Sequence, residues 1–248
     1  MMNERRLKIL DMLNESRSLD VAILAQMLDV SAVTVRKDLA ALEEKGLLRR
    51  QHGFALRVSQ DDVNYRMSFN YEIKKRIAHM AEEMVENGET IMIESGSTCA
   101  MLAAELAAKK RDITIITNSA FIAAHIRSFS GARAVLLGGY YEPDAQVMTG
   151  PLVRVCAREF FVDKFFIGTD GFDAEQGFSN VNLLRTEAVR AMAKSAKRRI
   201  ILTDSSKFNR RGVVSLMPLL DIALVITDAV PENCRKALIE SGVEIMIV

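Results

Sequence analysis

The sequence predicts an α/β protein in which a small, mainly helical N-terminal domain precedes a larger, doubly wound and mostly parallel α/β domain. Short helical patterns and a basic hairpin pattern occupy residues 1–58, and a polar stretch without periodicity covers residues 59–70. From residue 71 onward, apolar β-branched runs alternate with helical segments. We therefore expect domains at 1–58 and 71–248, joined by a linker at 59–70.

Composition places the chain among globular proteins, with 49% hydrophobic residues, 26% charged residues and a net charge of +1. No apolar run approaches the roughly 20 residues that cross a bilayer. The charged start, Met1–Lys8, lacks the apolar stretch of a signal peptide. We expect a cytoplasmic protein without membrane contact.

Cysteine usage argues against a disulfide framework or a zinc site. Cys99, Cys156 and Cys234 are widely spaced, and only three histidines accompany them. We expect buried thiols, no metal and no cofactor, although Cys99 sits beside a candidate anion site where a thiol can be activated.

The first 46 residues contain three short helical patterns. The first spans about Asn3–Glu15 and the second about Val21–Leu28, with Asp20 placed to cap the second. The third helix is expected to open at Ser31 and to close at Gly46. The apolar positions expected to face inward on the first two helices are Leu7, Ile9, Leu10, Leu13, Ile23, Leu24 and Leu28.

The third helix and the segment after it have the pattern of a DNA reader. At 100° per residue, Val35, Leu39 and Leu42 share one face of the helix, and Lys37 lies opposite. Its polar start and basic middle suit a recognition helix, and residues 47–58 read as two short strands around Gly53, a basic wing. Docking of another protein is the alternative. The predicted DNA contacts are Ser31, Thr34, Arg36, Lys37, Arg49, Arg50 and His52.

Apolar runs predict the strands of the larger domain. They are Thr90–Glu94, Ile113–Thr117, Ala134–Leu137, Lys164–Gly168, Arg199–Thr203, Ala223–Thr227 and Glu244–Val248. In a parallel sheet the ligand lies beyond the carboxyl ends of the strands, so the polar residues there are candidate ligand contacts. The candidates for binding an effector are Glu94, Ser95, Gly96, Ser97, Thr98, Asn118, Ser119, Gly138, Gly139, Asp170, Asp173 and Lys207.

The loop Ser95–Thr98 combines hydroxyls, backbone N–H groups and a helix N-terminus, which together bind phosphate in many folds. An ordinary tight turn is the alternative for this loop taken alone. Polar residues at the ends of neighbouring strands favour a binding site.

Two stretches resemble a known family. VSAVTVRKDLAALEEKGLLRRQHG, residues 30–53, resembles the DeoR-type helix-turn-helix of bacterial sugar-metabolism repressors. Residues 71–248 resemble the sensor domain of the same family, which is itself similar to ribose-5-phosphate isomerase. IESGST resembles the phosphate loop, GTDGFD the acidic turn that meets the sugar in the enzyme, and TDSSKF the terminal signature.

The resemblance implies a transcriptional regulator that represses genes of carbohydrate metabolism. Its partners would be a double-stranded DNA operator and an effector, a phosphorylated sugar or a similar anionic metabolite. One winged domain covers about half of a typical operator, so we also expect a homodimer or homotetramer.

Several positions depart from the family and enzyme patterns. Phe54 stands where the wing usually has a second glycine, and Glu94 stands where the family usually has Asp. Residues 177–184 contain no lysine where the isomerase has its catalytic one, although Glu187 falls near the position of its base. A general base without its electrostatic partner is a poor catalyst, and an acid near a helix N-terminus is the favoured role for Glu187.

We therefore expect no enzymatic activity. The alternatives are a sugar-phosphate isomerase with an accessory DNA-binding module, using Asp170, Asp173 and Glu187, and a regulator that has lost its ligand.

Overall fold

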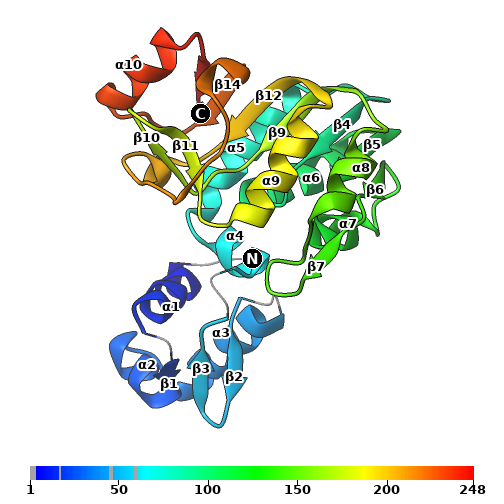
Figure 1. The fold of residues 1–248 in the computed structure, drawn as a ribbon. Helices are drawn as coiled ribbons and strands as arrows, with labels where there is room; N and C mark the ends of the chain where they lie inside the picture. The colour runs from blue at the N-terminus through cyan, green and yellow to red at the C-terminus, as the bar shows by residue number, and fades with distance from the viewer. Residues whose placement is uncertain (1–3, 17, 45–46, 59–60) are drawn as a thin grey trace. The chain divides into compact units, whose positions relative to one another are not determined.

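The computed structural model describes residues 4–16, 18–44, 47–58 and 61–248 (Figure 1). The chain divides into two compact units, Met1–Phe69 and Asn70–Val248. No helix in the described ranges is long and apolar enough to cross a membrane.

The N-terminal unit contains the expected helices and hairpin together with two elements that the sequence did not predict. Its elements are α1 Glu4–Glu15, β1 Ser18–Asp20, α2 Val21–Met27, α3 Ala32–Glu44, β2 Arg49–Gln51, β3 Phe54–Leu56 and α4 Val63–Ser68. β1 is one unpredicted element; it pairs with β3, so the wing is a three-stranded sheet in the order β1-β3-β2. Asn3 and Gly46, the expected first residue of helix one and cap of helix three, lie outside the described residues.

The core of this unit confirms most of the helix faces. Val35, Leu39 and Leu42 of α3 are fully buried, and Asp20 caps α2 by accepting hydrogen bonds from the N–H of Ala22 at 2.6 Å and of Ile23 at 3.4 Å. The inward position assigned to Ile23 is wrong, because its side chain is 50% exposed. The inward face of α2 runs through Val21, Leu24 and Leu28, spaced by three and four residues, and Ile23 lies 100° from Leu24.

A charged residue lies within the core of the N-terminal unit. Asp38 on α3 is only 2% exposed, and its two oxygens accept hydrogen bonds from Arg5 at 2.5 Å and Arg6 at 2.8 Å. Burial alone would raise the pKa of Asp38, but the two guanidinium groups outweigh it and lower that pKa. The ion pairs fasten α1 to the recognition helix.

The stretch predicted as an aperiodic linker contains the second unpredicted element. α4 begins after Asp62, whose carboxylate accepts hydrogen bonds from the N–H of Asn64 at 2.8 Å and of Tyr65 at 3.3 Å. At six residues, α4 is too short to show a helical period in the sequence. The first two residues of the predicted linker, 59 and 60, lie outside the described ranges.

The larger unit alternates helices and strands. Its main elements are α5 Tyr71–Glu83, β4 Thr90–Ile93, α6 Ser97–Lys109, β5 Ile113–Thr117, α7 Ala120–Ile126, β6 Ala132–Leu136, α8 Pro151–Ala157, β9 Val162–Ile167, α9 Leu183–Ala193, β12 Ala196–Leu202, β14 Leu224–Thr227, α10 Glu232–Glu240 and β15 Glu244–Ile247. The seven strands of this set form one sheet in the order β15-β14-β12-β9-β4-β5-β6, and every pair is parallel. All the predicted strands are confirmed.

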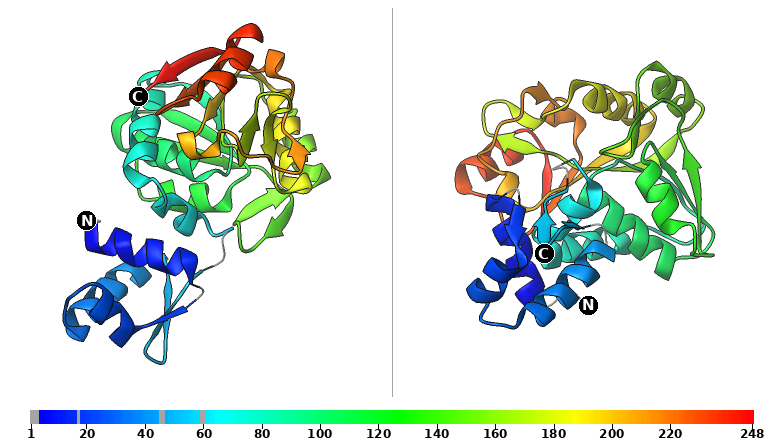
Figure 2. Two further views of the ribbon diagram at one scale, coloured as in Figure 1. Left: turned by 90° about the vertical axis from the view of Figure 1, so that its left-hand side faces the viewer. Right: turned by 90° about the horizontal axis from the view of Figure 1, so that it is seen from below.

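Helices cover both faces of this sheet. Figure 1 shows α8 and α9 in front of the sheet and α5 and α6 behind it, and Figure 2 shows the C-terminal strand β15 at one edge. Alternate residues of each strand divide between the faces: Phe165 and Ile167 of β9 pack with α8, α9 and α10, whereas Phe166 points the other way. The sheet is therefore doubly wound.

Two antiparallel pieces are inserted into this pattern, and the sequence did not predict either. One is the hairpin of β7 Tyr140–Glu142 and β8 Val147–Thr149, and the other joins β10 Gly171–Asp173, β11 Gly177–Asn180 and β13 Val214–Ser215. All five strands are two to four residues long, too short for their alternation to stand out in the sequence. Cys99 and Cys234 are buried as expected, but Cys156 is partly exposed.

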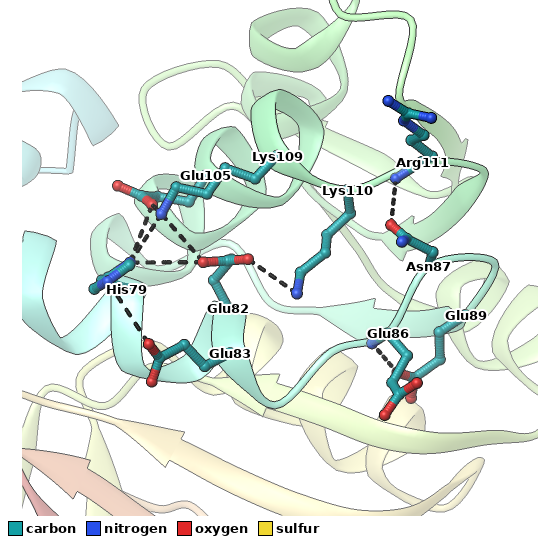
Figure 3. Close-up of polar contacts among 10 residues, drawn as sticks. All are labelled: His79, Glu82, Glu83, Glu86, Asn87, Glu89, Glu105, Lys109, Lys110 and Arg111. Atoms are coloured by element: carbon teal, nitrogen blue, oxygen red, sulfur yellow. Dashed lines mark hydrogen bonds and ion pairs between the residues drawn. The ribbon is translucent and has the colours of Figure 1, made fainter.

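A network of charges joins α5 to α6 on the surface (Figure 3). The Lys109 ammonium lies 2.5 Å from Glu105, 3.1 Å from Glu82 and 2.8 Å from the ring of His79. Lys110 holds the other oxygen of Glu82 at 3.0 Å. The spacing of His79, Glu82 and Glu105 would also suit a metal ion, but the Lys109 ammonium already supplies a cation there.

We expect Asp38→Asn to destabilise the N-terminal unit by about 2 kcal/mol, because it leaves two arginines without their carboxylate. The effect depends on pH in a defined direction. Since folding lowers this pKa, the stabilisation is complete above the ordinary value of 3.8 and is lost as the pH falls through the lower folded value. Urea unfolding of the wild type and the variant at neutral and acidic pH measures this difference in the free energy of unfolding.

Glu4→Gln is the matched control, because Glu4 and its partner Lys8 are 84% and 61% exposed and their pairing contributes little. Equal stability of Asp38→Asn and the wild type at neutral pH would contradict the role given to Asp38.

Candidate functional site

The recognition helix α3 presents the polar face that the sequence predicted. Ser31 accepts a hydrogen bond from the N–H of Thr34 at 3.2 Å, and the two hydroxyls lie 2.9 Å apart. Arg36 and Lys37 are exposed, with Lys37 opposite the buried Val35 and Arg36 on the flank of the helix. The start and the middle of α3 are therefore open to a partner.

The wing is a hairpin, and one of its arginines is already engaged. His52 and Gly53 have positive φ angles of 49° and 86°, as in the two-residue turns that match hairpin twist. The N–H of Arg50 donates to Glu43 at 2.7 Å and its guanidinium at 2.5 Å, which together hold the pKa of Glu43 below its ordinary value. Arg50 thus ties the wing to α3, while Arg49 and His52 are exposed.

Phe54, which replaces the second wing glycine of the family pattern, opens β3 directly after this turn. It pairs with Gln51 across the hairpin, and its side chain is 43% exposed. The wing closes without a second glycine.

In the larger unit, the loop after β4 is organised by Glu94. Its carboxylate accepts hydrogen bonds from the N–H of Gly96 at 2.7 Å, the N–H of Gly168 at 3.1 Å and the hydroxyl of Ser95 at 2.9 Å. Because Gly168 follows β9, one buried side chain joins the loops after two neighbouring strands. Contact between Glu94 and a ligand stays a prediction.

The helix that follows this loop begins without a capping side chain on its N-cap residue. Gly96 is the N-cap residue of the 13-residue helix α6, and its own N–H donates to Glu94. Ser97 is partly exposed at its first position, and Thr98 is buried. The first N–H groups of a helix lack partners within the helix, so this end can bind an anion.

Asn118 and Ser119 lie at the end of β5, next to that loop in the sheet. The hydroxyl of Ser119 caps α7 by accepting a hydrogen bond from Ile122 at 3.1 Å. The side-chain amide of Asn118 donates to the backbone carbonyl of Met148 on β8 at 3.1 Å, and the backbone carbonyl of Asn118 accepts from the N–H of Met148 at 2.7 Å. The β7–β8 hairpin is thereby attached to the end of β5.

Gly138 and Gly139 lead from β6 into this hairpin. A Cβ atom on Gly139 would lie 2.5 Å from the carbonyl oxygen of Thr149, so packing within the hairpin requires a glycine there. Gly138 is exposed, and a Cβ atom there would lie 3.8 Å from the Cys156 sulfur.

The two acidic residues predicted after β9 have different surroundings. The carboxylate of Asp170 accepts a hydrogen bond from the N–H of Val181 at 3.0 Å, which ties the end of β9 to the end of β11. Asp173 instead shapes the β10–β11 turn, where it accepts from the N–H groups of Glu175 and Gln176 at 3.0 and 3.1 Å and pairs with Arg211 at 3.1 Å. The structure does not show these two carboxylates converging on one point.

Lys207 lies in a short helical turn, Ser205–Lys207, directly after β12, and it is partly exposed. The buried Asp204 before it accepts hydrogen bonds from Asn70 and Ser206. Burial raises the pKa of Asp204, but the Ser206 hydroxyl, the Lys74 charge and the Asn70 amide outweigh burial and lower it. Sequence reasoning did not find the partners of Asp204, since Asn70 is 134 residues away.

Sequence reasoning also missed a polar group at the start of α9. Asn182 caps this helix by accepting from the N–H of Arg185 at 3.0 Å, and Arg185 pairs with Glu142 of β7 at 2.8 Å. The cap signal was present in the sequence as an asparagine before a helical stretch. No local pattern in the sequence indicated the ion pair between Arg185 and Glu142. Glu187, the candidate base, is exposed on α9.

A winged helix-turn-helix with an open basic face, joined to an α/β unit with a polar carboxyl edge, defines a ligand-responsive DNA-binding regulator. Residues 5–61 match the family model of the DeoR-like helix-turn-helix domain, and residues 69–229 match that of the DeoR C-terminal sensor domain. The chain belongs to the DeoR family of transcriptional regulators.

Relatives match over nearly the whole chain. The transcriptional regulator GolR of Listeria innocua is 31% identical over 91% of this chain and 90% of that protein. The transcriptional repressor AccR of Agrobacterium fabrum is 30% identical over 94% and 95%. The glycerol-3-phosphate regulon repressor of Haemophilus influenzae is 28% identical over 98% and 96%.

Among solved structures, ribose 5-phosphate isomerase A of Methanocaldococcus jannaschii is similar in part. It is 20% identical, with a TM-score of 0.41 over 56% of this chain and 55% of that one. Likeness at this level does not bear on catalytic activity.

We expect Lys37→Ala to weaken binding to random-sequence and selected duplexes alike, and to reduce the slope of log affinity against log salt by about one unit. Thr34→Ala should instead cost about 1–3 kcal/mol at one base pair of a selected site. Titrations at several salt concentrations separate the two effects.

Lys236→Ala is the control, because it removes the same charge from an exposed position on α10. Unchanged DNA affinity of Lys37→Ala at every salt concentration would contradict the assigned role of α3.

Proposed function

We propose that this protein represses genes of carbohydrate metabolism and that a phosphorylated sugar, or a similar anionic metabolite, controls its affinity for operator DNA. The observation that carries the effector proposal is the N-terminus of α6, where the N-cap residue Gly96 has no capping side chain, within the loop Ser95–Thr98. Lys207, at the end of another strand of the sheet, would add a cation. One relative is named for the glycerol-3-phosphate regulon, which supports a phosphate-bearing effector.

The DNA contacts in this proposal are Ser31 and Thr34 to bases and Arg36, Lys37, Arg49 and His52 to phosphates, with Arg50 positioning the wing. Two copies would bind the two halves of an operator, which favours a homodimer or homotetramer. Exposed apolar residues on the neighbouring helices α8 and α9, Leu152, Val155, Leu183 and Leu184, supply surface suited to such contact. The protein would act in the cytoplasm, where its DNA lies.

The proposal assigns no enzymatic activity to the larger unit. Residues 177–184 contain no lysine, and the basic residues of α9 on either side of the exposed Glu187 are the arginines Arg185 and Arg190. Turnover of ribose 5-phosphate above that of protein-free buffer would support the isomerase alternative instead.

We expect a phosphorylated sugar to raise the melting temperature of the full chain much more than its unphosphorylated parent does. Ligand at about 100 times its dissociation constant should stabilise the fold by about 2.7 kcal/mol. A thermal scan over triose, pentose and hexose phosphates measures this. No shift with any of them would contradict a phosphorylated effector.

Ser97→Asp tests the location of the site. A carboxylate at the first position of α6 stabilises the helix by about 0.3–1 kcal/mol but repels phosphate. The variant should therefore melt no lower than the wild type and lose the ligand-induced shift. Gly96 is less suitable for substitution, because a Cβ there would lie 2.9 Å from Glu94 Oε2 and 3.3 Å from Gly168 Cα.

Ser128→Asp, in the exposed segment before β6, is the control for Ser97→Asp and should keep the shift. A full shift in Ser97→Asp would place the phosphate elsewhere.

We expect the full chain to sediment as a dimer or larger at micromolar concentration, because a single wing and recognition helix cover only half of a two-fold operator. Analytical ultracentrifugation with and without duplex DNA measures the mass. A monomer under both conditions would contradict this assembly.

A further inference from the structure

An exposed valine lies near the start of the recognition helix, between two residues whose hydroxyls are already paired with each other. Val33 is the second residue of α3, and its side chain is 59% exposed. On either side of it in the chain, Ser31 accepts a hydrogen bond from the N–H of Thr34, and the two hydroxyls lie 2.9 Å apart. Val33 therefore adds an apolar surface where the neighbouring polar groups bind each other.

Val33 lies on the face of α3 that also carries the exposed cations. At about 100° per residue, Lys37 is about 40° and Arg36 about 60° away from Val33 around the helix axis. The buried Val35 is about 160° away on the same scale. Lys37 follows Val33 by one helical turn, so the basic face of α3 has an apolar side chain at its N-terminal end.

The fold of the N-terminal unit does not require a valine at this position. The side chains of α3 that form the core are Val35, Leu39 and Leu42, on the opposite side of the helix. In a helix, valine is also less favourable than alanine, because the preceding turn restricts its branched side chain. The isopropyl group of Val33 is therefore available to a partner of the helix.

The major groove of DNA presents one apolar group at the base edges, the 5-methyl group of thymine. Small apolar side chains contact this group, and the N-terminal residues of a recognition helix are the ones that reach the base edges. Val33 has both properties. The cations one turn further along α3 favour a nucleic acid over a protein as the partner of this face.

We propose that Val33 contacts the 5-methyl group of a thymine in the operator, so that the protein recognises one A·T pair by an apolar contact. The proposal rests on the proposed docking of α3 on DNA, in which Arg36 and Lys37 contact phosphates. Contact with a protein is the other use of this surface, because Ile23 and Met27 of α2 are also 50% and 57% exposed.

Replacement of thymine by uracil tests the contact, because uracil lacks the 5-methyl group but keeps the hydrogen-bonding groups of thymine. The full chain first selects duplexes from a random-sequence library, and each thymine of the selected site is then replaced in turn. We expect one replacement to weaken binding of the wild type about fourfold, the effect of losing the burial of one methyl group.

Val33→Ala should bring the thymine-to-uracil affinity ratio at that position close to one. The slope of log affinity against log salt should not change, because no cation is lost. The variant should stay folded, since alanine is the better helix former. Thr34→Ser, which removes only the methyl group of the neighbouring side chain, should preserve the ratio.

Val213→Ala is the matched control, because it makes the same chemical change at an 86% exposed position of the larger unit. It should leave the ratio as it is in the wild type. Thermal melting shows whether each variant is folded.

The outcomes separate this proposal from the docking on which it rests. If no thymine of the selected site is distinguished from uracil, or if the ratio persists in Val33→Ala, the thymine contact is wrong, and the salt slope of Lys37→Ala still tests the docking. A ratio lost in Thr34→Ser alone assigns the methyl contact to Thr34. An unchanged ratio with a smaller sedimenting mass in Val33→Ala assigns Val33, with Ile23 and Met27, to a protein contact. If the full chain selects no duplex, the docking fails, and this proposal fails with it.

Discussion

The carboxylate of Glu94 makes the contact on which the edge of the larger unit depends. It is 8% exposed and accepts hydrogen bonds from three donors, two of them backbone N–H groups in the loops after β4 and β9. A buried carboxylate needs such donors, so each loop can hold its position only if the other does. Through Gly96 this side chain positions the start of α6, and through Gly168 it positions the loop after β9 that contains Asp170.

The N-terminal unit uses charge in the same way. Asp38 fastens α1 to α3, and Glu43 fastens the wing to α3 through Arg50. Of these pairs, the one between Glu43 and Arg50 holds the wing against the recognition helix. The basic residues of this unit therefore divide into two groups. Arg5, Arg6 and Arg50 pair with carboxylates of α3, whereas Arg36, Lys37 and Arg49 are exposed and are the proposed contacts to DNA phosphates.

Regulation requires a part of the protein that has two arrangements, because a ligand shifts an equilibrium only by its difference in affinity for the two states. The β7–β8 hairpin is an insertion that contacts from distant segments attach to the rest of the larger unit. It is attached by the Asn118–Met148 hydrogen bonds and the Glu142–Arg185 ion pair, and two acceptors within those attachments, Oδ1 of Asn118 and Oε1 of Glu142, are unpaired among the described residues.

By itself, the sequence determined the features that depend on neighbours along the chain. The parallel strands follow from continuous apolar runs separated by helical stretches. The buried face of Val35, Leu39 and Leu42 follows from the period of 3.6 residues, and the Asp20 cap and the Gly53 turn follow from local hydrogen bonds and turn chemistry. Only the tertiary structure decided the partners of Asp38, Asn118 and Glu142, which lie 33, 30 and 43 residues away. No local pattern encodes such pairs, because they form only when the packing of the sheet and its insertions brings distant segments together.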